Sequence, residues 1–353
     1  MSQGPLRQPQ RTLHLHAGPH KTASTYLQAR LQLNRRGLAG LGLRYPTPWG
    51  EASHRHLARE LQTGRFEALE QLLGRQRPWS GDLLLSAEHF VPLLADAGSL
   101  AHLQQVSSRN GFGLHVISFV RPQAELLNSF YAHVLGRLYG TPGFGAYVKA
   151  QLGGRRLRGP ARRRWIRIAP LALDLEQRFA ALLMAPGLRT SFLPFAPRRQ
   201  DPFEQLLDAV GLPQAAWRPA PAAQANEQLG RRGLGLAYLL NAELDALPIR
   251  RNRLIAEHGL NRLTARIRSL SRQRGWVDER FNGWQGRLPV LLQQSLGASN
   301  GRFAQRVWAQ PWESVFSQSP MLATRGLVLD QELQEEAKCL FSSYRRRLPE
   351  ALR

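Results

Sequence analysis

The polar stretch from His16 to Gln28 combines the groups that bind an anion with a backbone that can present them. It follows a short apolar run and leads into a helical pattern, which predicts a strand, a tight loop and a helix. Such a loop directs backbone N–H groups and the positive end of the helix towards a bound anion. Lys21 adds a compact, mobile charge. Only three of the 48 basic residues are lysine, the others being Lys149 and Lys338, so a lysine here indicates a role that a rigid guanidinium does not serve.

The spacing within this stretch indicates which anion is bound. A Walker loop has four residues between its first glycine and the Gly-Lys pair. Gly18 lies only three residues before Lys21, and His20 stands where the second glycine would be. The loop is therefore shorter than a nucleoside-triphosphate loop, although it keeps the character of a phosphate cradle. Hydroxyl donors follow the lysine at three positions: Thr22, Ser24 and Thr25.

A second candidate pair lies in the middle of the chain, where the strand-like run 114–120 meets a helical pattern. Arg121 leaves the end of the predicted strand, and Ser129 follows eight residues later, about two helical turns along. A guanidinium at a strand end and a hydroxyl on the next helix can hold one phosphate between them. A structural explanation is also open, in which Arg121 only caps the sheet and Ser129 is a buried helix serine.

The loop around Lys21 resembles the 5′-phosphosulfate-binding loop of the sulfotransferases, whose pattern is roughly Lys-[Ser/Thr]-Gly-[Ser/Thr]-[Ser/Thr]. These enzymes use 3′-phosphoadenosine 5′-phosphosulfate (PAPS) as donor. Ala23 departs from the pattern, because the family usually has glycine there. The pair Arg121 and Ser129 is similar to the arginine and serine that grip the 3′-phosphate of the donor, although Pro122 comes one place earlier than usual. The chain thus resembles PAPS-dependent sulfotransferases of the bacterial, carbohydrate-sulfating type.

This resemblance implies transfer of a sulfuryl group from PAPS to a hydroxyl acceptor, leaving adenosine 3′,5′-bisphosphate (PAP). Sulfuryl transfer is an in-line displacement in which charge spreads over the equatorial and leaving oxygens. The resemblance makes Lys21 the catalytic cation on the bridging and leaving oxygens. No metal is required, because a sulfuryl group carries less charge than a phosphoryl group. The donor-binding residues implied are Gly18, His20, Lys21, Thr22, Ala23, Ser24, Thr25, Arg121 and Ser129.

The proton of the acceptor hydroxyl needs a base, and Glu88 is the first candidate. It follows the apolar run 82–86, a predicted buried strand, and resembles the glutamate of the carbohydrate-sulfating branch. A partly desolvated carboxylate beside the donor is expected to have a raised pKa. His89 is the second candidate, and His54 and His56 are weaker ones. The alternative is that Glu88 only orients Lys21 or caps the next helix.

Strands alternating with helices predict an α/β fold in which a central parallel sheet binds ligands at the carboxyl ends of its strands. Together with the loop, this predicts a P-loop-NTPase-like three-layer fold with a helical C-terminal portion. We expect residues 1–10 to be a flexible tail, 11–215 the PAPS-binding core, and 216–353 a helical portion packed on that core, the whole forming one structural domain. The proline-rich stretch 217–221 is the expected seam.

Composition limits the partners without choosing among them. The net charge of +23 indicates an anionic partner, yet abundant arginine with little lysine is also what a GC-rich coding sequence produces. The sequence contains no run of 18 apolar residues, so it predicts no transmembrane helix. The polar start lacks the apolar core of a secretory signal, and Cys339 is the only cysteine, so we expect a cytoplasmic enzyme.

Two other classes of function remain open. An ATP-dependent kinase or NTPase with a degenerate loop is disfavoured because the glycine before Lys21 is absent and neither central strand ends in aspartate. A non-enzymatic, basic nucleic-acid-binding protein could use the arginine-rich stretches 155–167 and 250–274, but such runs are more often solvated surfaces. Nucleic acid is therefore not the expected partner, and the acceptor is a hydroxyl compound that can be acidic or a carbohydrate.

Histidines near the loop suggest a metal site only weakly. His14 and His16 alternate along the first predicted strand, and His54 and His56 form a second pair. Nothing in the sequence connects the two pairs, so we expect core histidines with satisfied hydrogen bonds rather than metal ligands.

Overall fold

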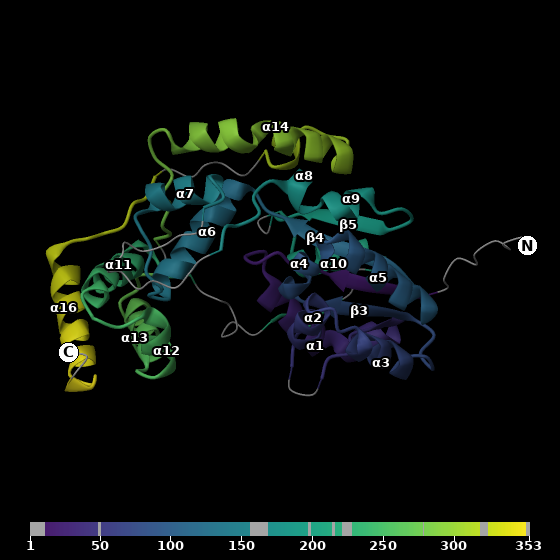
Figure 1. Ribbon diagram of the computed structural model, residues 1–353, viewed down its shortest axis with the longest axis horizontal. Helices are drawn as coiled ribbons and strands as arrows, with labels where there is room; N and C mark the ends of the chain where they lie inside the picture. The colour runs from purple at the N-terminus through teal and green to yellow at the C-terminus, as the bar shows by residue number, and fades with distance from the viewer. Residues whose placement is uncertain are drawn as a thin grey trace, which may run out of the picture. The chain divides into compact units, whose positions relative to one another are not determined.

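The computed structural model describes most of the chain in two compact units, and Figure 1 follows the chain through both. Unit 1 comprises Met1–Pro122, Asp174–Asn226 and Asn300–Ser319, and unit 2 comprises Gln123–Leu173, Glu227–Ser299 and Pro320–Arg353. The described residues are 11–48, 51–155, 169–196, 199–213, 216–220, 228–277, 279–317 and 324–350. The predicted tail at 1–10 and nearly all of the arginine-rich stretch 155–167 lie outside them.

Unit 1 is built on a five-stranded sheet in which every neighbouring pair of strands is parallel, in the order β2-β3-β1-β4-β5. This confirms the α/β prediction with a parallel sheet. The strands predicted from apolar runs are all present, whereas the two-residue β2 has too short a run to be recognised. The strands are β1 (Arg11–His16), β2 (Leu43–Arg44), β3 (Asp82–Ser86), β4 (Phe112–Val120) and β5 (Arg189–Pro194).

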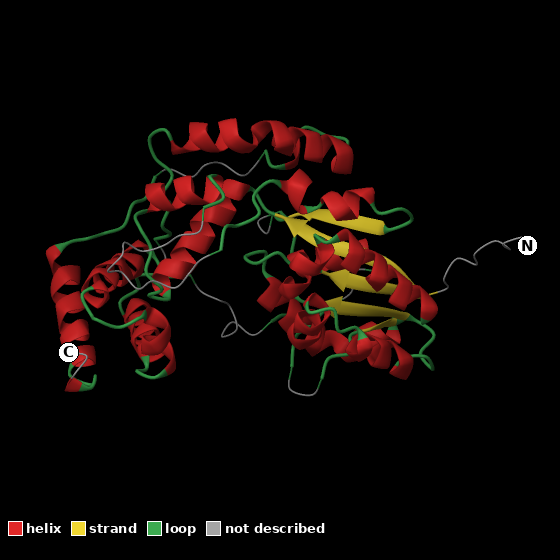
Figure 2. Cartoon of the chain, viewed as in Figure 1, coloured by secondary structure: helices red, strands yellow, loops and turns green. Residues whose placement is uncertain are grey.

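Helices cover both faces of this sheet, as Figure 2 shows for the strands in yellow and helices in red. One face packs against α1 and α10, and the other packs against the group from α2 to α5 together with α8 and α9. The helices of unit 1 are α1 (Ser24–Gly40), α2 (Arg55–Gln62), α3 (Glu67–Arg75), the 3₁₀ turn η1 (Glu88–Phe90), α4 (Val91–Leu94), α5 (Ala97–Arg109), α8 (Leu175–Arg178), α9 (Ala180–Met184), α10 (Pro202–Ala209) and α15 (Trp312–Val315).

Successive side chains of β1 alternate between the two faces of the sheet, so its apolar and polar side chains lie on opposite faces. On β1, Leu13 and Leu15 are fully buried against the α2–α5 face. His14 and His16 have the opposite parity and therefore lie on the face that α1 covers. Apolar side chains fill one face of the strand, while the buried polar groups gather beneath α1.

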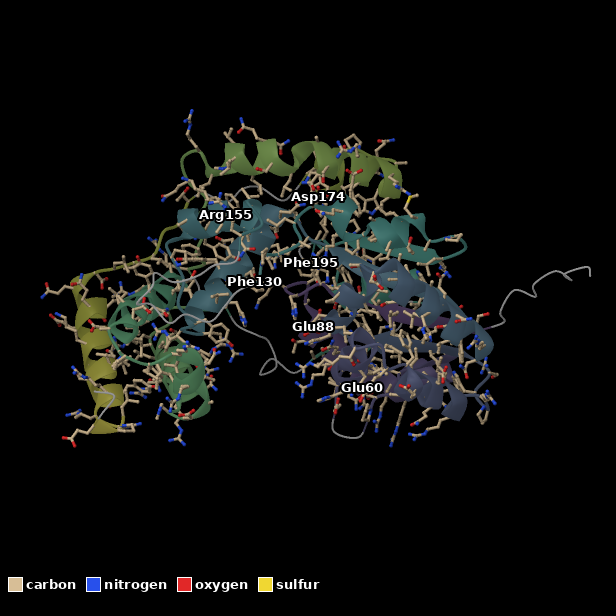
Figure 3. The ribbon with its side chains drawn as sticks, viewed as in Figure 1. Glu60, Glu88, Phe130, Arg155, Asp174 and Phe195 are labelled. Atoms are coloured by element: carbon tan, nitrogen blue, oxygen red, sulfur yellow. The ribbon has the colours of Figure 1, made fainter. Side chains whose placement is uncertain are left out.

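The connections after β1 and β3 run to opposite faces of the sheet. The chain leaving β1 enters α1, which packs in the core of one face, and the chain leaving β3 enters η1 and α4, whose residues pack in the core of the other. β1 and β3 are hydrogen-bonded neighbours. Ligands of parallel sheets bind where neighbouring connections diverge in this way, outside the carboxyl ends of the strands. Glu88, labelled in Figure 3, follows β3 at this place.

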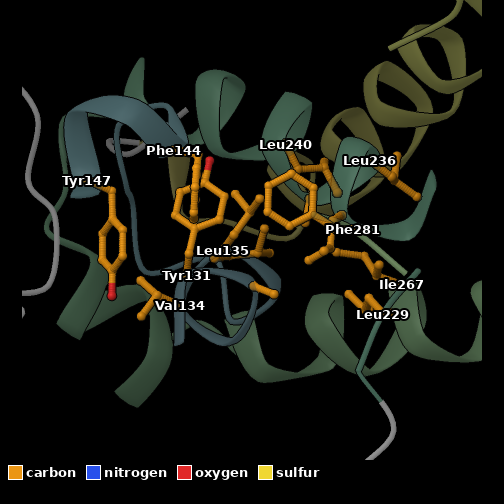
Figure 4. Packing of buried hydrophobic residues seen from close by; sticks show 14 of the residues in the cluster. Tyr131, Val134, Leu135, Phe144, Tyr147, Leu229, Leu236, Leu240, Ile267 and Phe281 are labelled. Carbon is orange, nitrogen blue, oxygen red and sulfur yellow. The ribbon is translucent and has the colours of Figure 1, made fainter. Parts of the chain in front are cut away.

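Unit 2 is helical, and its core is rich in aromatic residues, as the close view in Figure 4 shows. Tyr131 lies at its centre, with ring-centroid distances of 5.2 Å to Phe144 and 5.6 Å to Phe281. Its helices are α6 (Gln123–Gly136), α7 (Phe144–Leu152), α11 (Arg231–Asp245), α12 (Arg251–Ala256), α13 (Leu260–Gln273), most of α14 (Leu288–Trp308) and α16 (Gln331–Arg345).

The two units differ from the predicted domains. The boundary expected near residue 215 is not where the chain divides, since Gln123–Leu173 belongs to unit 2 and Asn300–Ser319 returns to unit 1. The reason is hydrophobic burial: α6 and α7 place Leu127, Leu135 and Tyr147 in the unit 2 core. A cut at one sequence position cannot represent such interleaving.

Some helices do not follow simple local signals. Helix α1 continues through Gly37 and ends at Gly40. Residues 51–75 contain two helices, α2 and α3, and residues 171–184 contain the short α8 and α9. The basic stretch 250–274 contains α12 and α13, and Leu263, Ile267 and Leu270 of α13 are buried.

None of the helices described in the structure is both long and apolar enough to cross a bilayer.

Candidate functional site

The loop between β1 and α1 is fixed to the strand beside it. Ala17 N–H donates to the carbonyl of Ile117 at 2.9 Å, and Phe119 N–H donates to the carbonyl of Gly18 at 3.0 Å. Gly18 has a φ of 57°, and a Cβ there would lie 2.8 Å from Cα of Glu88. Glycine is therefore required at this position, both for the backbone conformation and for the close approach of Glu88 to the loop.

Helix α1 begins without any side chain of its own to neutralise its positive end. Its N-cap residue, Ala23, makes no side-chain cap, and its first turn contains no acidic residue. A 17-residue helix has a substantial dipole, whose positive end favours an anion. Lys21 lies two residues before this N-cap and is half-buried. The predicted strand, loop and helix are thus present, with a lysine close to the N-terminus of the helix.

The three hydroxyl residues that follow Lys21 differ in their exposure. Thr22 is fully buried, and its Oγ1 donates to the carbonyl of Pro19 at 2.6 Å. Ser24 is also buried, with its Oγ 3.4 Å from the same carbonyl. Thr25 is exposed. In this structure the tight loop therefore uses the Thr22 hydroxyl to satisfy its own backbone, and the part of Thr22 in holding a phosphate stays a prediction.

Two non-glycine residues of the loop have left-handed backbone conformations, with φ of 69° at Lys21 and 59° at Ala23. A left-handed residue with a Cβ costs about 1–2 kcal/mol relative to the right-handed form. The position where the resembled pattern has glycine is thus a position that favours glycine.

Replacing Ala23 with glycine is expected to raise the free energy of unfolding by about 0.5–1 kcal/mol, since the relief of strain exceeds the added freedom of the unfolded chain. Urea denaturation measures the change. Ala29→Gly is the matched control: it lies inside α1 and is expected to lower stability by about 1 kcal/mol. Equal destabilisation by both changes would contradict the strain at Ala23.

Arg121 is directed at the loop. Its Nη1 donates to the carbonyl of Lys21 at 2.6 Å, and its guanidinium carbon lies 5.4 Å from the ring centroid of Phe195, which follows β5 and is labelled in Figure 3. The two motifs recognised in the sequence therefore meet at Arg121 and Lys21. Ser129 lies on α6, in unit 2, with intermediate exposure. Its part in binding a 3′-phosphate stays a prediction.

Glu88 lies against the loop at the carboxyl end of β3. Its Oε2 accepts from Nε2 of Gln28 at 3.2 Å, and its Oε1 is 3.9 Å from Nδ1 of His20. Gln28 also lies 3.4 Å from Oγ of Ser86. Glu88 thus lies beside both the loop and α1, and its part as a base stays a prediction.

The charge state of Glu88 differs from expectation. Burial raises its pKa, but its own backbone N–H, the Gln28 amide and the positive charge available on His20 and His89 together outweigh burial, so the pKa lies below its ordinary value. The predicted raised pKa is therefore wrong for this structure. Glu88 is ionised at neutral pH and is a weak proton acceptor.

His89 and His20 lie together beside this carboxylate. Their ring centroids are 5.7 Å apart in an edge-to-face arrangement. Nδ1 of His89 is buried, and no described residue forms a hydrogen bond with it. Gln62 Nε2 donates to the backbone carbonyl of His89 and so fixes the residue on η1.

Two further histidines support the site from below. His16 Nδ1 lies 2.7 Å from Oγ of Ser86, and burial lowers the pKa of His16 to about 4. His54 accepts from Ser86 N–H through Nδ1 and donates from Nε2 to the carbonyl of Pro46. Since both nitrogens of His54 are used and its pKa is lowered to about 4, it is a structural residue rather than a base.

His56 is exposed, and its Nε2 lies 3.8 Å from Glu51. It takes no part in the contacts described around Glu88.

At the far end of the same face, a second group of histidines is internally satisfied. His14 lies 3.2 Å from Asp82 through Nε2 and 2.9 Å from His115 through Nδ1, and His115 reaches Ser191 at 2.8 Å. Burial lowers the pKa of His115 to about 3. The expectation of a hydrogen-bonded core histidine is confirmed for His14. Within the described ranges, no group of three or more His, Cys, Asp or Glu side chains could hold a metal ion.

Sequence reasoning missed two residues of this site. Gln28 was recognised only as the end of the polar stretch, although a glutamine one helical turn inside α1 could have suggested a contact beneath the loop. Arg178, on α8, is close enough to lower the pKa of His20 by its charge. No local pattern marks it, because it reaches the site through the chain's later return to the sheet.

Comparisons with protein-family models, with curated proteins and with solved structures found no match for this chain.

Proposed function

We propose that this chain is a PAPS-dependent sulfotransferase with a P-loop-NTPase-like core, which transfers a sulfuryl group to a hydroxyl acceptor. One observation carries the proposal: Lys21 stands at the uncapped start of α1, and Arg121 donates to its carbonyl. The start of a helix, a lysine and an arginine thus lie together outside the carboxyl ends of parallel strands, where ligands of such sheets bind, and this supports a phosphate site.

In this proposal, the site residues of unit 1 have distinct roles. When PAPS is bound, it supplies the sulfuryl group and a phosphate leaving group. The start of α1 and the loop backbone hold the 5′-phosphate, and Lys21 stabilises the charge that develops on the oxygen between phosphorus and sulfur. Arg121 holds the Lys21 segment in place and offers its guanidinium to the 3′-phosphate. Ser129 remains a predicted partner for that phosphate.

The carboxylate of Glu88 and the histidines beside it handle the acceptor's proton. Glu88 lies 3.9 Å from His20, and His20 lies against His89, so a hydroxyl that approaches the loop meets several groups able to accept or relay a proton. The sequence predicts Glu88 or His89 as the base. The lowered pKa of Glu88 favours a role in which it acts through a neighbour.

The chemistry of the residues favours sulfuryl over phosphoryl transfer. Phosphoryl transfer relies on magnesium held by a hydroxyl next to the P-loop lysine and by a strand-end aspartate. Thr22, next to Lys21, uses its hydroxyl within the loop, and β4 is followed by Arg121. Asp82 stands at the first residue of β3, the end away from the loop. These placements support a donor that needs no metal, and so favour PAPS over ATP.

The proposal implies that the acceptor carries a hydroxyl group. A hydroxyl on a carbohydrate or on another small alcohol is expected, and the basic character of the chain allows an acidic one. A cytoplasmic location stays an expectation from the sequence.

A donor assay tests the proposal. The full chain is incubated in EDTA with PAPS labelled in its sulfate, against a panel of neutral glycans, acidic glycans, small alcohols and phenols. Labelled product and PAP in equal amounts support sulfuryl transfer. Release of phosphate from magnesium-bound ATP instead would establish the kinase or NTPase alternative, and steep salt-dependent binding of RNA or DNA that is unaffected by Lys21→Ala would establish the nucleic-acid alternative.

A further inference from the structure

His20 stands at the most open point of the loop. Its side chain is 57% exposed, whereas the Glu88 side chain behind it is 22% exposed. Nδ1 of His20 lies 3.9 Å from Oε1 of Glu88, so Nε2, on the other side of the ring, is the nitrogen left to meet an incoming molecule. His20 is also directly next to Lys21 in the chain.

Glu88 is held so that it can orient this ring. Gln28 donates to Oε2 of Glu88 at 3.2 Å, and Oε1 lies 3.9 Å from Nδ1 of His20, too far for a hydrogen bond but close enough for an ion pair with a protonated ring. The missing side chain at Gly18 allows the Glu88 backbone to lie against the loop that carries His20, since a Cβ on Gly18 would lie 2.9 Å from Cβ of Glu88. The Gln28 amide and the close packing at Gly18 therefore hold the carboxylate beside the imidazole.

We propose that His20 is the catalytic residue that accepts the proton of the acceptor hydroxyl, and that Glu88 is a positioning residue that holds the imidazole through Nδ1. This inference rests on the proposed sulfotransferase function for its chemical role. The acceptor oxygen forms a bond to sulfur while the bond from sulfur to the 5′-phosphate oxygen breaks. The hydroxyl proton passes to Nε2 of His20, and the electron pair of the broken bond stays on the phosphate of PAP. The imidazolium then releases its proton to solvent.

The groups around His20 suit this task. Partial burial lowers its pKa, the charge of Glu88 raises it, and the charges of His89, Lys21 and Arg178 lower it again, so the pKa lies below the ordinary value. The ring is therefore neutral at neutral pH and can accept a proton. Glu88, with its lowered pKa, is ionised and can stabilise the imidazolium that forms. A carboxylate behind an imidazole is a better arrangement for this transfer than the carboxylate alone.

Histidine NMR on the full chain without ligands tests the pairing of the two residues. Removing the carboxylate with Glu88→Gln takes away a group that stabilises imidazolium, so the pKa of His20 is expected to fall by about 0.5–1 unit. The matched control is Glu51→Gln, which removes a carboxylate 3.8 Å from Nε2 of the exposed His56 and is expected to leave the pKa of His20 unchanged. An unchanged His20 pKa in Glu88→Gln would overturn the proposed support, whatever reaction the chain performs.

The chemical role is tested with the acceptor that the donor assay finds to be sulfated fastest. His20→Asn keeps a polar group of similar reach and is expected to slow transfer about 100-fold or more while PAP affinity stays within threefold. The wild-type rate should fall at low pH with the pKa that NMR gives for His20, and Glu88→Gln should move that limb to lower pH. Full activity in His20→Asn, or loss of PAP affinity together with activity, would overturn the assignment. Absence of PAP binding and sulfate transfer in the wild type would instead contradict the proposed function, leaving the NMR result to stand alone.

Discussion

Lys21→Ala is expected to lower the rate of sulfuryl transfer by about 1,000-fold while leaving the free energy of unfolding within about 0.5 kcal/mol. The reason is that the Lys21 ammonium stabilises charge that develops on the leaving oxygen, in a site that already directs the positive end of α1 to the same place. Labelled transfer from PAPS measures the rate, and urea denaturation measures the stability.

Lys149→Ala is the matched control for this change. Lys149 is exposed on α7 in unit 2, so its loss removes the same charge without touching the loop and is expected to leave the transfer rate unchanged. Lys21→Arg should restore little activity, because a planar guanidinium cannot follow a moving oxygen as a compact ammonium does. Transfer by Lys21→Ala at more than a tenth of the wild-type rate would remove Lys21 from the chemistry.

Arg121→Ala is expected to weaken PAP binding by about 10–100-fold, a larger effect on donor affinity than on the rate with saturating donor. Loss of a charged hydrogen bond to a phosphate costs about 1.5–3 kcal/mol. The change also removes the 2.6 Å hydrogen bond to the Lys21 carbonyl, so the loop loses part of its support. Isothermal titration calorimetry with PAP measures the affinity.

Arg189→Ala provides the comparison for Arg121. Arg189 is an exposed arginine at the amino end of β5, and its removal should leave PAP affinity unchanged. Equal PAP affinity in the wild type and in Arg121→Ala would show that the strand-end arginine only supports the loop, and the resemblance of the second motif to a 3′-phosphate site would then be misleading.

The sheet was predictable because its strands carry strong local signals. Buried runs such as 82–86 and 114–120 are too apolar to be surface segments, and they reappear as β3 and β4. β2 was missed because only Leu43 and Arg44 form it. Helix α1 continues through Gly37, and the next residue, Leu38, is buried in the core on that face of the sheet. Packing against the core outweighs the local cost of a glycine in a helix.

The domain organisation was beyond local reasoning. Helix α6 directly follows β4 in the chain, so by local reasoning it would pack on the sheet as a connection between two parallel strands. Its buried face, however, packs against α11, more than 90 residues later in the chain, through residues such as Leu135 and Leu234. Only the pairing of distant apolar faces reveals that the chain leaves unit 1 at Gln123.

The site was half predictable. Lys21 and Glu88 follow neighbouring parallel strands, so their proximity could be inferred from topology alone. The electrostatics could not, because the pKa of Glu88 depends on Gln28 and His20, whose side-chain directions the sequence does not give. The structural role of His54 could not be predicted either, because it follows from the hydrogen bonds that both ring nitrogens form in the fold.

The central claim is that the loop of unit 1 binds a 3′-phosphorylated adenine nucleotide without metal, and equilibrium binding of PAP in EDTA tests it most directly. We expect calorimetry to show one PAP per chain in EDTA, no gain in affinity on adding magnesium, and at least about tenfold weaker binding of magnesium-bound ATP, a difference of about 1.4 kcal/mol. Lys21→Ala and Arg121→Ala should both weaken the PAP signal. Tight, magnesium-dependent ATP binding with no PAP binding in EDTA would contradict the account.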